Sequence, residues 1–324
     1  MNPGRIALVA LALAAFAGNS LLCRMALRTT VIDPASFTAI RLLSGALALC
    51  AIILARRQRP GGTWVSAAAL FAYAIAFSYA YAGLPAGTGA LLLFGAVQAT
   101  MLGHAVRSGA RLAPVQLLGL VLAAAGLVAL LLPGLAAPSP PHAGLMLAAG
   151  FAWGVYSLRG RAPGDPTAAT AGNFLRAVPF AALPLLASPL AAPLAIDPAG
   201  MLYAVLSGAI ASGLGYAIWY AALRGLTAAT AATVQLAVPL LAALAAVPLL
   251  DEPFTLRLLL SAAAILGGIA LVIRTPARLS VLPRRPLAND VSIDISAGFP
   301  KTGHPPPETP TVTSPAPPAG PARP

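Results

Sequence analysis

Charge is scarce in this chain of 324 residues: only 9% are Asp, Glu, Lys or Arg, whereas about a quarter is usual in a soluble domain. Acidic side chains are the scarcest, with 8 Asp and Glu against 20 Lys and Arg, and 59% of the residues are hydrophobic. A globular protein of this size has too little polar surface to cover so much apolar material. The composition therefore excludes a soluble enzyme and a disordered scaffold, and it predicts a protein that crosses a membrane several times.

Cysteine and catalytic motifs are also lacking. The two cysteines, Cys23 and Cys50, stand in separate apolar stretches, which excludes a disulfide framework and a cysteine metal site. The sequence contains no H-E-x-x-H, G-x-S-x-G or P-loop pattern, and its histidines at 104, 142 and 304 are scattered. We therefore expect no enzyme activity, no cofactor and no metal. The net charge of +12 lies mostly in short segments and near the C-terminus, where it orients membrane spans and does not indicate nucleic acid.

Long apolar stretches dominate what is present. A helix needs about 20 apolar residues to cross the hydrocarbon core, so we predict an all-α polytopic membrane protein with ten transmembrane helices. The predicted spans are 6–26, 35–54, 64–83, 86–106, 112–132, 143–160, 168–188, 201–222, 227–249 and 256–273. Proline-rich composition after Arg274 predicts a disordered cytoplasmic tail over residues 275–324. The first stretch also resembles a secretory signal, an alternative that the repeat described below disfavours.

Arginine placement predicts the orientation. With a cytoplasmic N-terminus, the segments on the inner side hold nine Arg even without the tail, and the outer segments hold three. Because Lys and Arg accumulate on the cytoplasmic side, we predict a multi-pass protein of the cytoplasmic (inner) membrane with both termini in the cytoplasm.

The chain contains an internal repeat. The pattern G-L-x-A-x-T-x-A occurs at residues 83–90 and again at 225–232, and Asp33-Pro34 followed by Arg41 returns as Asp165-Pro166 followed by Arg176, with three extra residues between. This predicts two repeats, 1–135 and 142–274, of five spans each. Five is odd, so the second repeat enters the membrane from the opposite side. Inverted repeats are typical of transporters, with the substrate site near the midplane between them.

Three motifs carry a resemblance to a known family: Pro34-x-x-Phe37-x-x-x-Arg41, Asn173-Phe174-x-Arg176, and Val238-Pro239-Leu240-Leu241 with Asp251-Glu252 after it. Over residues 1–274 the chain resembles the EamA family of the drug/metabolite transporter superfamily. Two departures stand out, because the first half has Gly109-Ala110 where the family has an acidic residue, and Asp251 replaces the usual glycine before Glu252. The resemblance implies transport of small metabolites, commonly amino acids or drugs.

Polar and aromatic side chains within the spans are the candidates for a substrate cavity. Such groups are costly in a membrane and usually face a cavity or another helix. Those predicted to bind substrate lie in spans of both halves: Asn19, Ser78, Gln98, Trp153, Tyr156, Trp219, Tyr220 and Gln235. Aromatic residues near span ends equally suit an interfacial belt, so both interpretations stay open for them.

Three charged residues and one histidine complete the candidates. Arg41 and Arg176 stand at corresponding places in the repeat, where they either attract substrate carboxylates or phosphates or stabilise the helices; we favour the structural role. Glu252 is expected to cap the tenth helix, with proton coupling as the alternative. His104 is the candidate for proton coupling because its ordinary pKa suits that task, although a structural role is favoured for it.

The sequence as a whole predicts a secondary transporter that works by alternating access. We expect it to move a small metabolite, such as an amino acid or a drug-like solute, most plausibly outward. The alternative is a non-transporting membrane sensor or assembly component on the same scaffold. The expected partners are a small-molecule substrate and the lipid bilayer, and association into a homodimer is left open.

Overall fold

The computed structural model describes residues 3–109, 112–132, 138–160, 164–191, 194–223 and 234–274, and within these ranges it contains helices and no strand. The helices are α1 (Pro3–Thr29), α2 (Pro34–Ala55), α3 (Trp64–Gly83), α4 (Ala86–Arg107), α5 (Pro114–Leu131), α6 (Pro140–Arg159), α7 (Pro166–Ala177), η1 (Val178–Ala181), α8 (Ala182–Ala191), α9 (Pro198–Val205), η2 (Leu206–Leu214), α10 (Gly215–Leu223), α12 (Ala237–Leu250) and α13 (Leu256–Arg274). The predicted tail and the motif at 225–232 lie outside the described residues.

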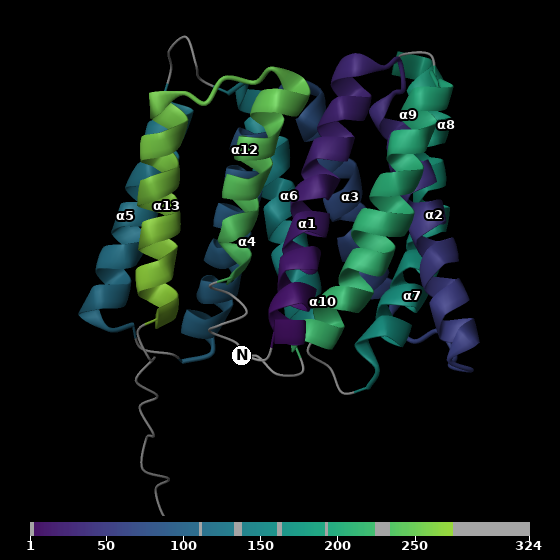
Figure 1. Cartoon of the computed structure of the whole chain (residues 1–324), viewed down its shortest axis with the longest axis horizontal. Coiled ribbons are helices and arrows are strands. Elements are labelled where there is room, and N and C mark those ends of the chain that lie inside the picture. Colours follow the sequence, from purple (N-terminus) through teal and green to yellow (C-terminus); the bar gives the residue numbers. More distant parts are fainter. Residues whose placement is uncertain are drawn as a thin grey trace, which may run out of the picture. The chain divides into compact units, whose positions relative to one another are not determined.

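The described helices form ten segments that run alternately up and down (Figure 1), because α7, η1 and α8 follow one another directly, as do α9, η2 and α10. This confirms the all-α class. Eight of the described segments are long and apolar enough to span a membrane. The other two are α6, which carries Trp153, Tyr156 and other polar residues, and α12, which is 14 residues long. The first part of the ninth predicted span falls in residues 224–233, outside the described ranges.

Three of the helices begin with the same pair of residues. Asp33, Asp165 and Asp197 each precede a proline and accept hydrogen bonds from backbone N–H groups of the first turn. Aspartate at the N-cap satisfies donors that the helix leaves unpaired, and proline fits the first helical position because it has no N–H to lose. The hydrogen bond from the N–H of Ala168 lowers the pKa of Asp165 below its ordinary value.

Two segments depart from regular α-helix. The seventh segment tightens into the 3₁₀ turn η1, which contains Pro179, a residue without the N–H that an α-helix needs. The eighth segment widens into the π-helix η2, in which hydrogen bonds link residues five apart. Within this π-helical segment Ser207 donates to Asn19 of α1, whereas Ser212, five residues later, lies 3.5 Å from Arg41 Nη2 of α2.

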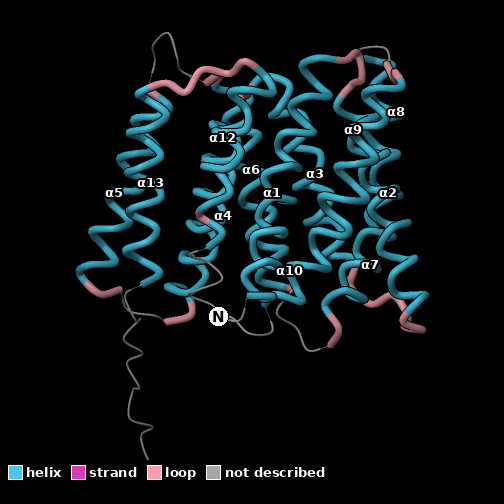
Figure 2. The backbone as a smooth tube through the Cα atoms, viewed as in Figure 1, coloured by secondary structure: helices cyan, strands magenta, loops and turns pink. Residues whose placement is uncertain are grey.

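Packing brings distant parts of the sequence together. α3 and α4 pack on α6, α2 packs on η2 and α7, and α1 packs on α9, η2, α10 and α12. α4 also contacts α12, while α5 and α13 lie side by side along their lengths (Figure 2). The buried core residues come from α1 to α7, η1, α9, α10, α12 and α13. Helices from the first and the second half of the sequence therefore border one common space.

Candidate functional site

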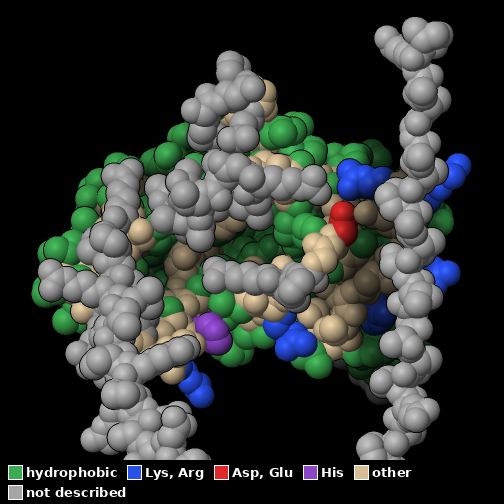
Figure 3. All heavy atoms as spheres, turned by 90° about the horizontal axis from the view of Figure 1, so that it is seen from below, with side chains coloured by type: hydrophobic (Ala, Val, Ile, Leu, Met, Phe, Trp, Pro, Cys, Tyr) green, Lys and Arg blue, Asp and Glu red, His purple; other side chains and the backbone are tan. Residues whose placement is uncertain are grey.

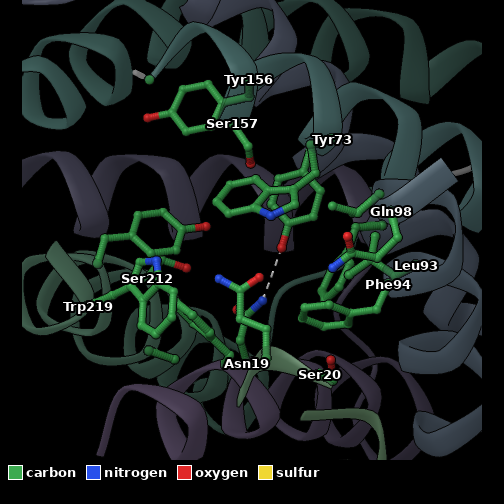
Figure 4. A pocket seen from close by; sticks show the side chains of 18 of the residues that line it. Asn19, Ser20, Tyr73, Leu93, Phe94, Gln98, Tyr156, Ser157, Ser212 and Trp219 are labelled. Carbon is green, nitrogen blue, oxygen red and sulfur yellow. Dashed lines mark hydrogen bonds between the residues drawn. The ribbon is translucent and has the colours of Figure 1, made fainter. Parts of the chain in front are cut away.

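A cavity of about 290 Å³ lies among α1, α3, α4, α6, η2, α10 and the residues just before α12. Side chains from these helices converge on it (Figure 4). Most of the predicted substrate-binding residues line it, namely Asn19, Gln98, Trp153, Tyr156, Trp219, Tyr220 and Gln235. The tertiary structure therefore gathers into one place residues that are up to about two thirds of the chain apart.

Ser78 is the predicted residue that does not line this cavity. Its hydroxyl donates to the carbonyl of Ala74 at 2.9 Å and accepts from Thr38 at 2.8 Å, and the side chain is buried between α2 and α3. Both hydrogen-bonding functions are used within the protein, so Ser78 joins two helices and has no group free for a solute.

Several lining residues escaped the sequence prediction, among them Tyr73, Phe77 and Ser212. Tyr73 and Phe77 are four residues apart in α3, and Tyr81 follows after four more. Residues four apart share a helix face, so this spacing was the signal that would have identified an aromatic face on α3. For Ser212 no such signal exists, because its direction depends on the π-helical winding of η2.

Hydrogen bonds join the polar residues on one side of the cavity. The Ser207 hydroxyl donates to Asn19 Oδ1 at 2.7 Å, and Asn19 Nδ2 donates to the Tyr73 hydroxyl at 3.3 Å (Figure 4). Arg41 Nη2 donates to the same Tyr73 oxygen at 3.0 Å and lies 3.5 Å from the Ser212 hydroxyl oxygen. Asn19, Tyr73 and Ser212 line the cavity, whereas Arg41 lies directly behind them.

Arg41 is a buried cation without an acidic partner. Its side chain is 2% exposed, and its guanidinium carbon lies 4.9 Å from the ring centre of Phe77 and 5.2 Å from that of Tyr73. Aromatic faces attract cations at such distances. Within the part of the chain that the structure describes, the ion pairs are those of Glu252 with Arg24 and Arg28, and Arg41 Nη1 has no hydrogen-bond partner.

Arg176 has a different environment. It donates to the carbonyl of Gly61 and, at 2.9 Å, to that of Gly172, and its guanidinium lies 6.0 Å from the Trp64 ring centre. These contacts hold the segment between α2 and α3 against α7. Arg176 is the eleventh residue of α7, whereas Arg41 is the eighth of α2, so the two arginines lie at different depths.

The chain is similar to a known family, to a curated protein and to a solved structure. The model of the EamA-like transporter family matches residues 142–274. An uncharacterized protein of Pseudomonas aeruginosa is 59% identical over 270 residues, which cover 82% of this chain and 93% of the relative. The chain belongs to the EamA-like transporter family. A solved crystal structure of a protein has the same fold, with a TM-score of 0.58 and 23% identity over 82% of this chain and 98% of the other.

This EamA-like protein is thus a multi-pass membrane protein of a transporter family. The family match covers the range that the sequence predicts for the second repeat; the division into two repeats stays a prediction.

The contacts of Glu252 correct the prediction that it caps the tenth helix. In this EamA-like protein the carboxylate accepts from Arg24 Nε at 2.8 Å and from the backbone N–H of Ala86, the first residue of α4, at 2.7 Å. Glu252 is 7% exposed. It therefore caps α4, because residues 251–255 turn back over the end of that helix before α13 begins at Leu256. We call Arg24, Ala86 and Glu252 the end lock.

Neighbouring contacts reinforce the end lock. Arg24 Nη1 also donates to the carbonyls of Tyr81 at 2.9 Å and Ala82 at 3.2 Å, and Arg28 donates to the carbonyl of Leu250. The ends of α1, α3 and α12 and the start of α4 are thereby joined at the C-terminal end of α1.

His104, the candidate for proton coupling, lies in the last turn of α4, where its side chain is exposed. It does not belong to the residues that line the cavity. A second cavity of about 300 Å³, almost entirely apolar, lies between α4, α5 and α13. Gln98 and Met101 line both spaces.

Proposed function

We propose that this protein is a secondary transporter that moves a small metabolite, such as an amino acid or drug-like solute, out of the cell by alternating access. The observation that carries the proposal is the central cavity. Its walls combine α1, α3 and α4 of the first predicted repeat with α6, η2 and α10 of the second. A space between two halves that move against each other can be opened to either side in turn.

The packing supports an inverted arrangement of the two predicted repeats. The third span of the first repeat, α3, packs on the first span of the second, α6; in exchange the third span of the second repeat, made of α9, η2 and α10, packs on α1. The remaining equivalent spans contact one another, namely α2 with α7, α4 with α12, and α5 with α13. Any two-fold axis that relates the repeats produces such reciprocal pairs, and the odd number of spans in each predicted repeat puts that axis in the membrane plane.

The two ends of the cavity differ, as loading of an exporter from the cytoplasm requires. The end lock joins the helices at the C-terminal end of α1. At the other end the lining reaches Gly160, an exposed residue after α6. In the view from this end, hydrophobic side chains are visible between the segments drawn in grey (Figure 3). Arginine placement assigns this end to the cytoplasm, so the cavity loads from the cell interior.

Flux through reconstituted vesicles tests the proposal. Proteoliposomes are loaded with labelled amino acids and small organic acids, and release of each is compared with that from protein-free vesicles. We expect Gln235→Leu to lower release of a transported solute because it removes an amide from the cavity wall. Ser78→Ala is the control, since Ser78 does not line the cavity and its hydroxyl bonds to Ala74 and Thr38.

The same release with and without protein for every solute would contradict transport and favour the sensor alternative. An equal loss of flux in Gln235→Leu and Ser78→Ala would contradict the assignment of the cavity as the substrate site.

A further inference from the structure

We propose that the central cavity recognises a small organic monocarboxylate, with the carboxylate at Tyr73 and Ser212 in front of Arg41 and an apolar or aromatic body against the neighbouring aromatic side chains. This inference rests on the proposed transport function and names the substrate class of the same site.

The hydrogen bonds at Tyr73 leave its hydroxyl group free to donate into the cavity. A phenolic oxygen has one hydrogen to donate and accepts through its lone pairs. The Tyr73 oxygen accepts from Arg41 Nη2 at 3.0 Å and from Asn19 Nδ2 at 3.3 Å. Its own hydrogen is therefore left to donate, and Tyr73 lines the cavity. The Ser212 oxygen, 3.5 Å from Arg41 Nη2, is oriented in the same way. This side of the cavity presents donors, and a carboxylate accepts from donors.

The uncompensated positive charge of Arg41 also favours an anionic solute. Arg41 is 2% exposed, and Nη1 has no partner among the described residues. A cation buried inside a membrane protein is costly unless an opposite charge compensates it, yet the acids nearest in sequence, such as Asp33, cap helix ends. A monoanion in the cavity supplies the missing charge. A cationic solute would be repelled, and a doubly charged one would bring an excess negative charge beside a single guanidinium.

The remaining walls decide what the carboxylate is attached to. Phe16 contacts the rings of Tyr216 and Trp219 at 5.9 and 5.7 Å between centroids, and Trp153 lies 5.2 Å from Tyr216. Ligand sites typically have about 300–1,000 Å³, so a cavity of about 290 Å³ admits only a small molecule. Among the described residues that line it there is no Asp or Glu to pair with an ammonium group, and this favours a simple carboxylic acid over an amino acid.

Tryptophan emission reports binding directly. Trp153 and Trp219 line the cavity, while Trp64 is 59% exposed at the start of α3. In purified full-length protein carrying Trp64→Phe, we therefore titrate benzoate, its neutral analogue benzamide, and zwitterionic phenylalanine. We expect saturable changes in emission with benzoate at concentrations about tenfold lower than with benzamide, the effect of one hydrogen bond to a charged group.

Arg41→Gln separates charge from shape, because glutamine keeps an N–H donor and loses the charge. We expect this variant to bind benzoate and benzamide equally. Arg176→Gln is the matched control, since Arg176 contacts Gly61 and Gly172 outside the cavity lining; it should keep the preference for benzoate. If Arg41→Gln fails to fold, Tyr73→Phe removes the donating hydroxyl and leaves the ring beside Arg41, and it should weaken benzoate binding more than benzamide binding, because a hydrogen bond to a charged group is the stronger one.

The outcomes distinguish this inference from the transport proposal. Equal binding of benzoate and benzamide by the protein with an intact Arg41, tighter binding of phenylalanine than of benzoate, or an unchanged preference in both Arg41→Gln and Tyr73→Phe would overturn carboxylate recognition. Vesicle flux of a neutral or zwitterionic solute alongside any of these results would leave transport standing. Selective benzoate binding without flux of any solute would support the carboxylate site and contradict transport.

Discussion

Asp251 adopts a backbone conformation that glycine tolerates better than other residues. It follows the last residue of α12 with φ 50° and ψ 35°, in the left-handed region. Its carboxylate also stands at a helix C-terminus, where the dipole disfavours negative charge. The EamA family, which the chain resembles over residues 1–274, commonly has glycine here. The left-handed backbone at Asp251 therefore lowers the stability of the folded protein locally, and it allows the chain to turn back and place Glu252 over α4.

Replacing Asp251 by glycine should stabilise the protein. Relief of the left-handed strain and of the charge at the end of α12 is worth about 1–2 kcal/mol, and the greater freedom of glycine in the unfolded chain removes about half of that. We expect a net gain of about 0.5–1 kcal/mol, measured as a higher midpoint of thermal unfolding in detergent. Asp251→Asn, which removes only the charge, should gain less. A lower midpoint for Asp251→Gly would show that the carboxylate stabilises the turn.

At the scale of the elements, the crossing of α2 and η2 determines where Arg41 lies. A Cβ atom at Gly208 would come within 2.1 Å of the Arg41 carbonyl oxygen and the Ser44 hydroxyl, and one at Gly45 would come within 2.6 Å of the Phe174 ring. Only glycine permits so close an approach of two helices. The close contact brings Ser212 of η2 to Arg41 of α2.

Gly208→Ala tests this crossing. The added methyl group meets backbone that cannot rotate away, so we expect a loss of stability of about 1–3 kcal/mol and weaker solute binding, because α2 and η2 must separate. Gly18→Ala in α1 is the control. No atom lies within 4 Å of its Cβ position, and alanine there should stabilise the helix by about 0.5–1 kcal/mol. Equal unfolding midpoints for the two variants would contradict the tight crossing.

At the scale of the whole described bundle, the end lock lies directly beside the cavity, because α1 contributes residues to both. Ser20 lines the cavity about one helical turn from Arg24, so in the proposed alternating-access cycle we expect opening of the lock to expose Ser20 to the outer side. The carboxylate of Glu252 connects α12 with both α1 and α4. Alternating access requires these connections to break when the cavity opens outward.

Glu252→Gln should therefore increase the time spent open to the outside. In a protein carrying Ser20→Cys, Cys23→Ala and Cys50→Ala, we expect a membrane-impermeant thiol reagent added to the outer side to label position 20 about tenfold faster. Breaking a buried ion pair costs more than the 1.4 kcal/mol that a tenfold shift requires. The rate of labelling is measured by mass spectrometry of intact protein.

Asp251→Asn provides the matched control for the lock, because it removes the adjacent, exposed carboxylate and should leave labelling unchanged. The same rate in the Glu252→Gln protein and in its parent would contradict a gating role for the lock. Labelling only from the cytoplasmic side, in all variants, would contradict the orientation deduced from arginine.

Much of the site could be predicted from composition alone. Polar and aromatic side chains are so rare in the apolar segments that Asn19, Gln98 and Gln235 stood out, and the cost of burying them without partners predicted that they face a shared space. Ser78 satisfied the same criterion, but its hydroxyl bonds to the carbonyl four residues earlier and to Thr38. Sequence cannot distinguish these cases, because a small hydroxyl finds partners within its own helix.

Sequence by itself determined the helical segments, their Asp-Pro starts and the family, because apolar length, N-caps and proline act locally along the chain. Only the tertiary structure decided what the charged residues do. Glu252 caps α4 instead of its own neighbour, and Arg41 lies behind the cavity while Arg176 holds a connecting segment. The reason is physical: a charge in a low-dielectric interior acts on whatever packing places within a few ångströms, and that neighbour is generally far away in sequence.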